Sequence, residues 1–515
     1  MTDKTKKFTN RRYLDAVEDR VILFDGAMGT NLDRQNLTLE HFGGEKTAGC
    51  NDYLVITYPQ AVEKVHRSFL EVGSDVIETD SFRANRLTLS EFGLGDRVYE
   101  INHAAAALAR KVADKFSTPE KPRFVAGSIG PSGKLISTED PQMSDISFEQ
   151  LKEIFREQAI GLIEGGVDLL LIETSQDILE VKSVIHGIKA AFDETGQVLP
   201  IQAQVTLDTT GRMLLGTDIA AALAILEGMG IDLIGLNCST GPDYMREPIR
   251  YLTENSKLPV SCIPNAGLPL NVDGEAVYPM KPGPFSALML EFVNDYGVRV
   301  VGGCCGTREA HIQLINEGLN RTRPMPEEPE IEPVLASPVQ AVSMQQTPPP
   351  FLIGERLNTQ GSRQFKRLIM AEDYDGIIEM ARTQVVSGAH GLDVCVALTE
   401  RDNEAEVMAK LVKKLANAVP VPLVIDTTEI EVIETALKAN PGRCLINSTH
   451  LEAGPEKASQ IFKLAKHFNA AVILLPIDEE GIAKTADRKR AVAKRLYDLA
   501  VGDYGLQPQD LGYDA

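Results

Sequence analysis

Three cysteines have the type and spacing needed to bind a metal ion. Cys238 ends an apolar run in the sequence GLNCST, and Cys304 and Cys305 end another in the sequence GGCCG. Zinc prefers thiolate ligands in a tetrahedron, and three protein ligands leave a fourth position free, which is typical of a catalytic site. The glycines beside the pair let the backbone turn tightly, so that two neighbouring side chains can face one ion. The sequence therefore predicts zinc bound by these three cysteines.

The charge of such a site indicates what it can activate. Three thiolates around Zn²⁺ give a net charge of about −1, which suits the binding of another thiolate better than the activation of water. Bound zinc would lower the pKa of a thiol from about 8.5 and keep it nucleophilic at neutral pH. Two alternatives remain: Cys238 is a small buried residue, or Cys304 and Cys305 form an inert or redox-active pair without metal.

The elements that must position these cysteines form a repeated pattern. Short apolar, β-branched runs alternate with helical segments, which predicts βα units around a parallel sheet. Eight such runs lie near residues 21–25, 75–79, 124–130, 168–174, 200–206, 232–238, 259–264 and 298–304. Helices are predicted at 59–72, 148–164, 177–192 and 308–320. Eight strands predict a closed (β/α)8 barrel, whose strand ends would bring all three cysteines to one rim.

The pattern breaks and then restarts. Residues 321–350 are rich in Pro, Glu, Ser and Gln, which predicts a semi-extended linker. Further strands are predicted near residues 351–354, 391–396, 422–426, 443–447 and 470–475, with a sixth starting around Leu511. The predicted domains are a barrel over 1–320, the linker, and a second barrel over 351–515. We expect an α/β protein with two TIM-type barrels in tandem, the second cut short after five to six strands, in a fragment of a longer protein.

Composition limits the partners of this chain. The 73 acidic and 52 basic residues give a net charge of −21, which repels nucleic acid and anionic lipid. No run approaches the roughly 18 apolar residues that a membrane span needs. Seven scattered cysteines in 515 residues are typical of a reducing compartment, unlike a dense disulfide framework. We expect a cytoplasmic protein with neither nucleic-acid nor membrane partners.

The first half of the chain resembles a known family. The sequence DGAMGT at residues 25–30, the pair Asn237-Cys238 and the sequence GGCCG at residues 302–306 are similar to the signatures of the homocysteine S-methyltransferase domain, over roughly residues 10–320. The resemblance implies that the cysteine-bound zinc activates homocysteine as a methyl acceptor. It also implies that the amino acid part of homocysteine is held by Asp25, Gly26 and Glu173. Without it, Asp25-Gly26 could be a simple turn and Glu173 a helix cap.

Residues after the second predicted strand are further candidates for this pocket. Glu78, Ser81 and Asn85 would lie in the loop that follows the strand. Glu78 could equally be the structural partner of a neighbouring lysine or arginine. We expect these three residues to line the pocket.

Polar residues also end the strands of the second domain. The sequences GERLN at 354–358, LDVC at 392–395, VIDT at 424–427 and LINS at 445–448 resemble the pterin-binding domain of cobalamin-dependent methionine synthases, which is related to dihydropteroate synthase. Carboxylates and amides suit the donors and acceptors on the edge of a reduced pterin. The resemblance implies that 5-methyltetrahydrofolate contacts Glu355, Asn358, Asp393, Asp426, Asn447 and Asp514.

At one position this sequence differs from the pterin-binding family, and the polar residues of the second domain also allow another interpretation. Cys395 stands where the family usually has Asn, and a thiol cannot make the same amide hydrogen bonds. The alternative is that Asp393, Asp426 and Asn447 only cap the helices that follow them.

The resemblance also implies a mobile methyl carrier. In this family, methylcobalamin takes the methyl group from the folate and delivers it to homocysteine. The corrinoid signature Asp-x-His-x-x-Gly is absent from this sequence. We therefore expect cobalamin to be bound by a module of the full-length protein that this chain lacks. The competing hypotheses are a direct homocysteine methyltransferase that uses betaine or a sulfonium donor, and a zinc- or folate-binding module without turnover.

Overall fold

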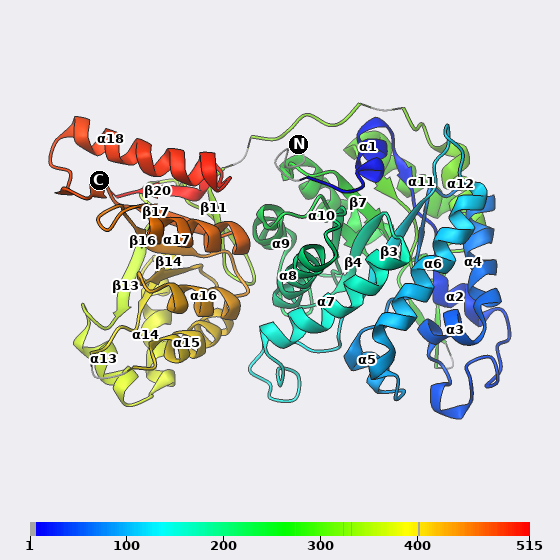
Figure 1. Cartoon of the computed structure of the whole chain (residues 1–515), viewed down its shortest axis with the longest axis horizontal. Helices are drawn as coiled ribbons and strands as arrows, with labels where there is room; N and C mark the ends of the chain where they lie inside the picture. The colour runs from blue at the N-terminus through cyan, green and yellow to red at the C-terminus, as the bar shows by residue number, and fades with distance from the viewer. Residues whose placement is uncertain (1–6, 273, 323, 331, 400–401, 515) are drawn as a thin grey trace. The chain divides into compact units, whose positions relative to one another are not determined.

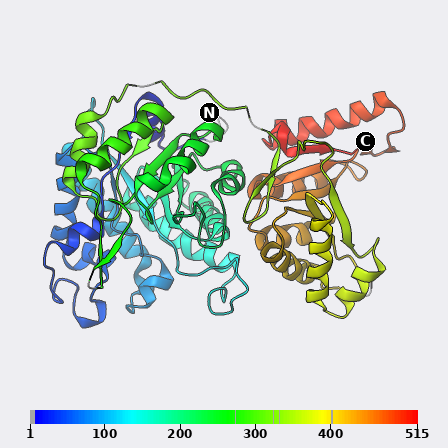
Figure 2. The same cartoon turned by 180° about the vertical axis from the view of Figure 1, so that it is seen from behind.

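The computed structural model describes residues 7–272, 274–322, 324–330, 332–399 and 402–514. The chain forms two compact units (Figures 1 and 2). The first comprises residues 1–135, 146–215 and 230–329, and the second comprises residues 136–145, 216–229 and 330–515. Each unit is built around its own parallel sheet.

The sheet of the first unit is a barrel. Within the described ranges it has eight strands, in the order β1-β10-β7-β6-β5-β4-β3-β2. They are β1 (Ile22–Leu23), β2 (Val76–Glu78), β3 (Phe124–Ile129), β4 (Leu169–Ser175), β5 (Ile201–Val205), β6 (Leu233–Asn237), β7 (Val260–Ile263) and β10 (Val300–Val301). The Asp75 N–H donates to the Leu23 carbonyl over 2.7 Å, and the Leu23 N–H donates to the Asp75 carboxylate over 2.9 Å. These bonds join the two edges, so the prediction of an eight-stranded α/β barrel is confirmed.

The helices around this barrel begin where the sequence predicts. The predicted helices correspond to α4 (Pro59–Glu71), α7 (Phe148–Gly165), α8 (Ile178–Thr195) and α12 (Glu309–Gly318), and α6 (Val98–Phe116), α10 (Pro242–Asn255) and α11 (Pro282–Glu291) surround the same sheet (Figure 1). Ser147 and Gln150 form a capping box at the start of α7, and the Asp177 carboxylate caps α8. These caps satisfy backbone N–H groups that have no partner within the helix.

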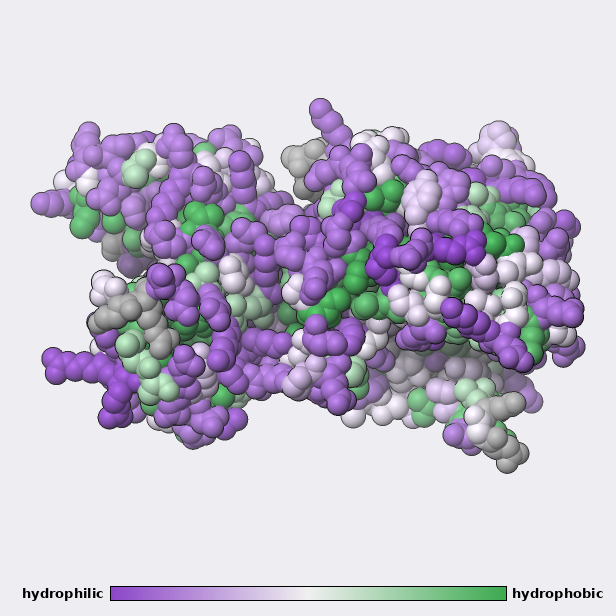
Figure 3. All heavy atoms as spheres, turned by 60° about the horizontal axis from the view of Figure 1, so that its bottom comes forward, coloured by the Kyte–Doolittle hydropathy of each residue, from purple (hydrophilic) through white to green (hydrophobic). Residues whose placement is uncertain are grey.

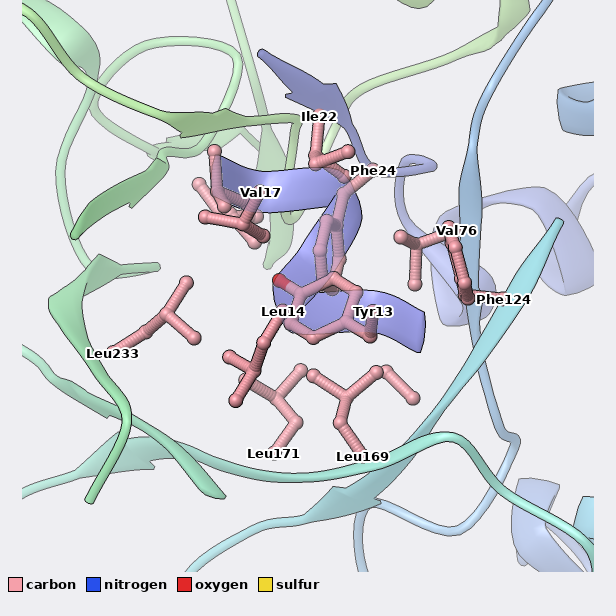
Figure 4. Packing of buried hydrophobic residues seen from close by; sticks show 13 residues of the cluster. Tyr13, Leu14, Val17, Ile22, Phe24, Val76, Phe124, Leu169, Leu171 and Leu233 are labelled. Carbon is pink, nitrogen blue, oxygen red and sulfur yellow. The ribbon is translucent and has the colours of Figure 1, made fainter. Parts of the chain in front are cut away.

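A short helix covers the amino end of the barrel. Helix α1 (Arg12–Asp19) inserts the buried side chains of Tyr13, Leu14 and Val17 among inward-facing strand residues (Figure 4). The Tyr13 hydroxyl donates to the Gln202 side-chain oxygen over 2.7 Å. Burial of each large apolar side chain contributes about 1.5–3 kcal/mol. Because α1 fills the amino end, the carboxyl ends of the strands remain available for a site.

The second unit has an open parallel sheet. In the part of the chain that the structure describes, its six strands follow chain order: β13 (Ile353–Asn358), β14 (Gly391–Cys395), β15 (Leu423–Asp426), β16 (Leu445–Thr449), β17 (Ala471–Leu474) and β20 (Leu511–Tyr513). The helices between them include α14 (Tyr374–Val386), α15 (Glu404–Ala418), α16 (Ile430–Ala439), α17 (Pro455–Phe468) and α18 (Ala486–Tyr497). Six strands of a βα repeat agree with the predicted incomplete barrel.

Part of the predicted linker is folded. Strands β11 (Val334–Ala336) and β12 (Ala341–Ser343) pair as an antiparallel hairpin. Leu335 is fully buried against the core of the second unit, and Ala336 exchanges two backbone hydrogen bonds with Arg443, of 3.0 and 2.8 Å. These residues therefore depart from the extended linker that composition predicts. A single apolar side chain is too little for a core of its own, yet it can join a core built by other segments.

The surface of the protein is largely hydrophilic on the face that Figure 3 shows. Hydrophilic residues cover most of the face that Figure 3 shows, and apolar residues gather in smaller patches between them. Among the described residues, no helix combines the length and the apolar character that crossing a membrane requires.

Candidate active site

The three cysteine sulfurs meet at the carboxyl end of the first barrel. The Sγ atoms of Cys238 and Cys305 lie 4.0 Å apart, and the three sulfurs all lie within 4.8 Å of one another. Tetrahedral zinc with bonds of about 2.3 Å places its sulfur ligands about 3.8 Å apart. A disulfide would need about 2.05 Å, and all three cysteines are free. The spacing therefore suits a shared metal ion and does not suit a disulfide.

The backbone conformation around the cysteines determines where their side chains lie. Cys238 and Ser239 both have φ of 58°, in the left-handed region that costs non-glycine residues on the order of 1 kcal/mol or more. The N–H groups of Cys238 and Cys304 donate to the carbonyls of Ile263 and Pro264 over 3.1 and 2.7 Å. The end of β7 thus holds the segments that follow β6 and β10 beside each other.

The thiols share their protons. The pKa of the Cys305 thiol is lowered to about 3, because Cys238 and then Cys304 donate hydrogen bonds to its sulfur. The same contacts, led by that with Cys238, raise the pKa of Cys304 well above its usual range. A cation bound at this point would displace the shared protons, since metal ligands must be deprotonated. The donor set thus fits a thiophilic cation such as zinc.

A buried carboxylate lies at the end of β1. One Asp25 oxygen, Oδ2, accepts the Glu78 N–H over 3.1 Å, while the other, Oδ1, is buried without a hydrogen-bond partner among the described residues. Burial raises the pKa of Asp25 well above its usual range. At Gly26, an added Cβ would lie 2.8 Å from the Phe69 ring and from the Thr307 hydroxyl, so only glycine fits. An unsatisfied buried oxygen is costly, and a ligand ammonium would satisfy it.

A second carboxylate is held toward the same site by β4. Ser128 Oγ donates to Glu173 Oε1, and Asn237 Nδ2 donates to Glu173 Oε2 over 3.1 Å. Burial raises the pKa of Glu173 to about 7. Burial, and then the charges of Glu173 and Asp25, raise the pKa of Glu78 well above its usual range. Three crowded carboxylates beside three thiols favour a positively charged ligand.

Two residues beside the cysteines position other residues of the site, and the sequence interpretation assigned neither of them a role. Asn237 accepts the Thr174 N–H over 2.8 Å while it donates to Glu173. Thr307 Oγ1 accepts the Ala27 N–H over 3.1 Å and donates to the Cys304 carbonyl over 2.6 Å. Adjacency to the cysteines was the only sequence signal for either residue.

The two remaining pocket candidates have local partners. Ser81 Oγ donates to the Ser128 carbonyl over 2.8 Å. The Asn85 side chain caps α5 (Arg86–Ser90) by accepting two backbone N–H groups. Both residues are fully buried, so these hydrogen bonds give them a structural role in the loop after β2.

The second unit gathers four of its predicted residues into one cluster. Asn358 Nδ2 donates to Asp426 over 2.8 Å and to Asp393 over 3.3 Å, and Asn447 Nδ2 donates to Asp393 over 3.4 Å. Burial, followed by the charge of Asp426, raises the pKa of Asp393 to about 6. The pKa of Asp426 is also raised, mainly by burial. The cluster presents acceptors that N–H donors of a ligand could satisfy.

Three other residues that the sequence singled out in this unit lie outside the hydrogen-bonded cluster. Glu355 is exposed on β13, and its charge helps to raise the pKa of both aspartates. Cys395 is buried at the end of β14, directly opposite Asn358 in the strand register. Asp514 is exposed and its N–H donates to the Leu474 carbonyl over 3.2 Å. Within the described ranges, no hydrogen bond joins Asp514 to the cluster.

Two protein families match this chain. Residues 22–319 match the family described as homocysteine S-methyltransferase. This chain belongs to that family. Residues 354–515 match the family described as pterin binding enzyme.

Two curated relatives match nearly the whole chain. The methionine synthase of Mycobacterium tuberculosis is 38% identical over 517 residues, which cover 100% of this chain and 43% of the relative. The methionine synthase of Mycobacterium leprae is 38% identical over 501 residues, which cover 96% of this chain and 41% of the relative. The chain therefore spans less than half the length of these relatives.

Solved structures show a more distant likeness. The metallated homocysteine methyltransferase MmuM of Escherichia coli is 21% identical, with a TM-score of 0.48, and the match covers 60% of this chain and 98% of that one. A dihydropteroate synthase of Xanthomonas albilineans is 17% identical, with a TM-score of 0.28, and the match covers 36% of this chain and 65% of that one. At these values, the likeness does not extend to the roles of individual residues.

Proposed function

We propose that the first barrel binds zinc through Cys238, Cys304 and Cys305 and activates the thiol of homocysteine as a methyl acceptor. The observation that carries this proposal is the meeting of three free thiols within 4.8 Å at the carboxyl end of a barrel. Zinc held there would act as a Lewis acid that keeps a bound thiol deprotonated at neutral pH. The three cysteines leave a fourth position for the substrate sulfur.

The carboxylates of the first barrel would orient the substrate. The unpartnered Asp25 Oδ1 and the Glu173 carboxylate offer acceptors for the ammonium group of homocysteine. The backbone at Gly26 would donate to the substrate's own carboxylate, while the Phe69 ring and the Thr307 hydroxyl fill the space that a side chain would take there. Glu78 adds a third carboxyl group to the same pocket, where burial and the charges of Glu173 and Asp25 raise its pKa. Orientation matters because methyl transfer requires the donor and the acceptor to lie in line.

The second unit would supply the methyl donor, and we propose that this donor is 5-methyltetrahydrofolate. Its pterin ring presents N–H groups that Asp393 and Asp426 can accept, while Asn358 and Asn447 hold the two carboxylates in place. Glu355 and Asp514 would contribute from the rim of the sheet. Cys395 lacks an amide, so the pterin would make fewer hydrogen bonds at that position.

Transfer between the two sites would use methylcobalamin bound by a further module of the full-length protein, which gives a cobalamin-dependent methionine synthase. Two relatives named methionine synthase are more than twice the length of this chain. The family match to a pterin-binding enzyme favours a folate donor over betaine or a sulfonium compound.

Metal analysis and a methyl-transfer assay together test this proposal. We expect one zinc ion per chain, and methionine from homocysteine when methylcobalamin is added. Cys238→Ala should lose both. Cys262→Ala is the matched control, because Cys262 is a buried cysteine of the same barrel whose sulfur contacts Met245. Absence of zinc would refute the proposal, while zinc without methionine would favour a binding module. Formation of methionine from 5-methyltetrahydrofolate without added cobalamin would refute the proposal that cobalamin carries the methyl group.

A further inference from the structure

An irregularity in β4 lies at Glu173. The register between β4 and β5 shifts between Ile172 and Ser175. Two residues of β4, Glu173 and Thr174, therefore lie opposite one residue of β5, as in a β-bulge. Thr174 has φ of 57°, in the left-handed region that a non-glycine residue adopts only where its surroundings hold it. Bulges redirect side chains beside active sites, and the backbone groups that they leave unpaired need partners from elsewhere.

Asn237, the last residue of β6, supplies these partners. Its Oδ1 accepts the Thr174 N–H over 2.8 Å, and its Nδ2 donates to Thr174 Oγ1 over 2.9 Å and to Glu173 Oε2 over 3.1 Å. Because β5 lies between β4 and β6 in the sheet, this fully buried side chain reaches past one strand. The Thr206 hydroxyl holds the Asn237 carbonyl over 2.8 Å. One amide thus fixes both residues of the bulge.

We propose that Asn237 is a positioning residue that makes the pocket selective for a thiol carrying an ammonium group. This inference rests on the proposed binding of homocysteine. Glu173 can accept the ammonium only while its carboxylate keeps one orientation, and a neutral amide holds Oε2 without the competing charge that a lysine or arginine would bring. Asn237 also directly precedes Cys238. One short segment therefore sets the distance between the ammonium acceptor and the metal that receives the sulfur.

Calorimetric titration of the zinc-loaded chain with two thiols tests this role without any turnover. The first is homocysteine, and the second is 4-mercaptobutyrate, which is homocysteine without its ammonium group. Asn237→Ala should weaken homocysteine binding about 10- to 100-fold, the usual cost of losing a hydrogen bond to a charged group. The affinity for 4-mercaptobutyrate and the zinc content should not change. Asn237→Ser, which keeps a small polar side chain but no amide, should give the same pattern and replaces Asn237→Ala if that variant does not fold.

The controls separate this inference from the proposed function. Gln202→Ala removes a buried amide of the same barrel, the partner of the Tyr13 hydroxyl, and should leave the ratio of the two affinities unchanged. If the unaltered protein binds neither thiol, the proposed function fails. If it prefers homocysteine and Asn237→Ala keeps that preference, only the role of Asn237 is overturned. Equal losses of both thiols in Asn237→Ala, or no preference in the unaltered protein, would overturn that role as well.

Discussion

Replacing Glu173 by glutamine should stabilise the substrate-free protein and remove its affinity for homocysteine. Burial raises the pKa of this carboxyl from 4.5 to about 7, so ionising it in the folded state costs free energy. The Ser128 hydroxyl and the Asn237 amide contact its two oxygens, and a glutamine side chain has the same shape. Glu173→Gln therefore removes the charge while it keeps most of the packing.

The size of the effect depends on pH. Below pH 4.5 the carboxyl is protonated in both the folded and the unfolded protein, so the charge has no effect. As pH rises to 7, the unfolded state ionises first, and the free energy of unfolding of the unaltered protein falls by about 3 kcal/mol. The free energy of unfolding of Glu173→Gln does not fall in this way, because glutamine does not ionise. Its advantage should be about 1.4 kcal/mol at pH 5.5 and about 3 kcal/mol at pH 8.

Urea titrations followed by circular dichroism at these two pH values would measure the stability, and calorimetry would measure homocysteine binding. We expect binding to weaken about 100-fold or more, because the ammonium loses a buried carboxylate. Glu180→Gln is the matched control: Glu180 is also buried, burial raises its pKa to about 7, and Ser132 is its partner. That variant should show the same stability change with unaltered binding. A stability difference that does not grow between pH 5.5 and pH 8 would refute the reasoning.

Two further predictions concern the second unit and the barrel core. Because burial and the charge of Asp426 raise the pKa of Asp393 to about 6, binding of 5-methyltetrahydrofolate should weaken about tenfold at pH 5 relative to pH 8. Asp393→Asn should bind weakly and without this dependence in calorimetric titrations, and a pH-independent affinity of the unaltered protein would contradict the assignment. Tyr13→Phe should lower the free energy of unfolding by about 1–3 kcal/mol, because the buried Gln202 oxygen loses its donor. Thermal denaturation measures this loss of stability. The zinc content of the variant should not change. An unaltered melting temperature would show that the hydrogen bond contributes nothing to stability.

Much of the fold could be predicted from the amino-acid sequence because it depends on local periodicity. Apolar, β-branched runs mark both sheets, and every predicted strand of the first barrel corresponds to an observed one. Pro59 marked the start of α4, because proline is favoured at the first position of a helix. The hairpin β11–β12 escaped prediction, because Leu335 is buried by residues far along the chain and not by its neighbours.

The sequence by itself determined which residue types were available for chemistry: three thiols at strand ends, and carboxylates and amides after other strands. Only the tertiary structure decided which of them meet. It placed Asn237 against Glu173 and, among the described residues, left Asp514 without a hydrogen bond to the cluster on its own sheet. The physical reason is that such contacts join residues tens of positions apart, so they have no period in the sequence and exist only once the sheet has formed.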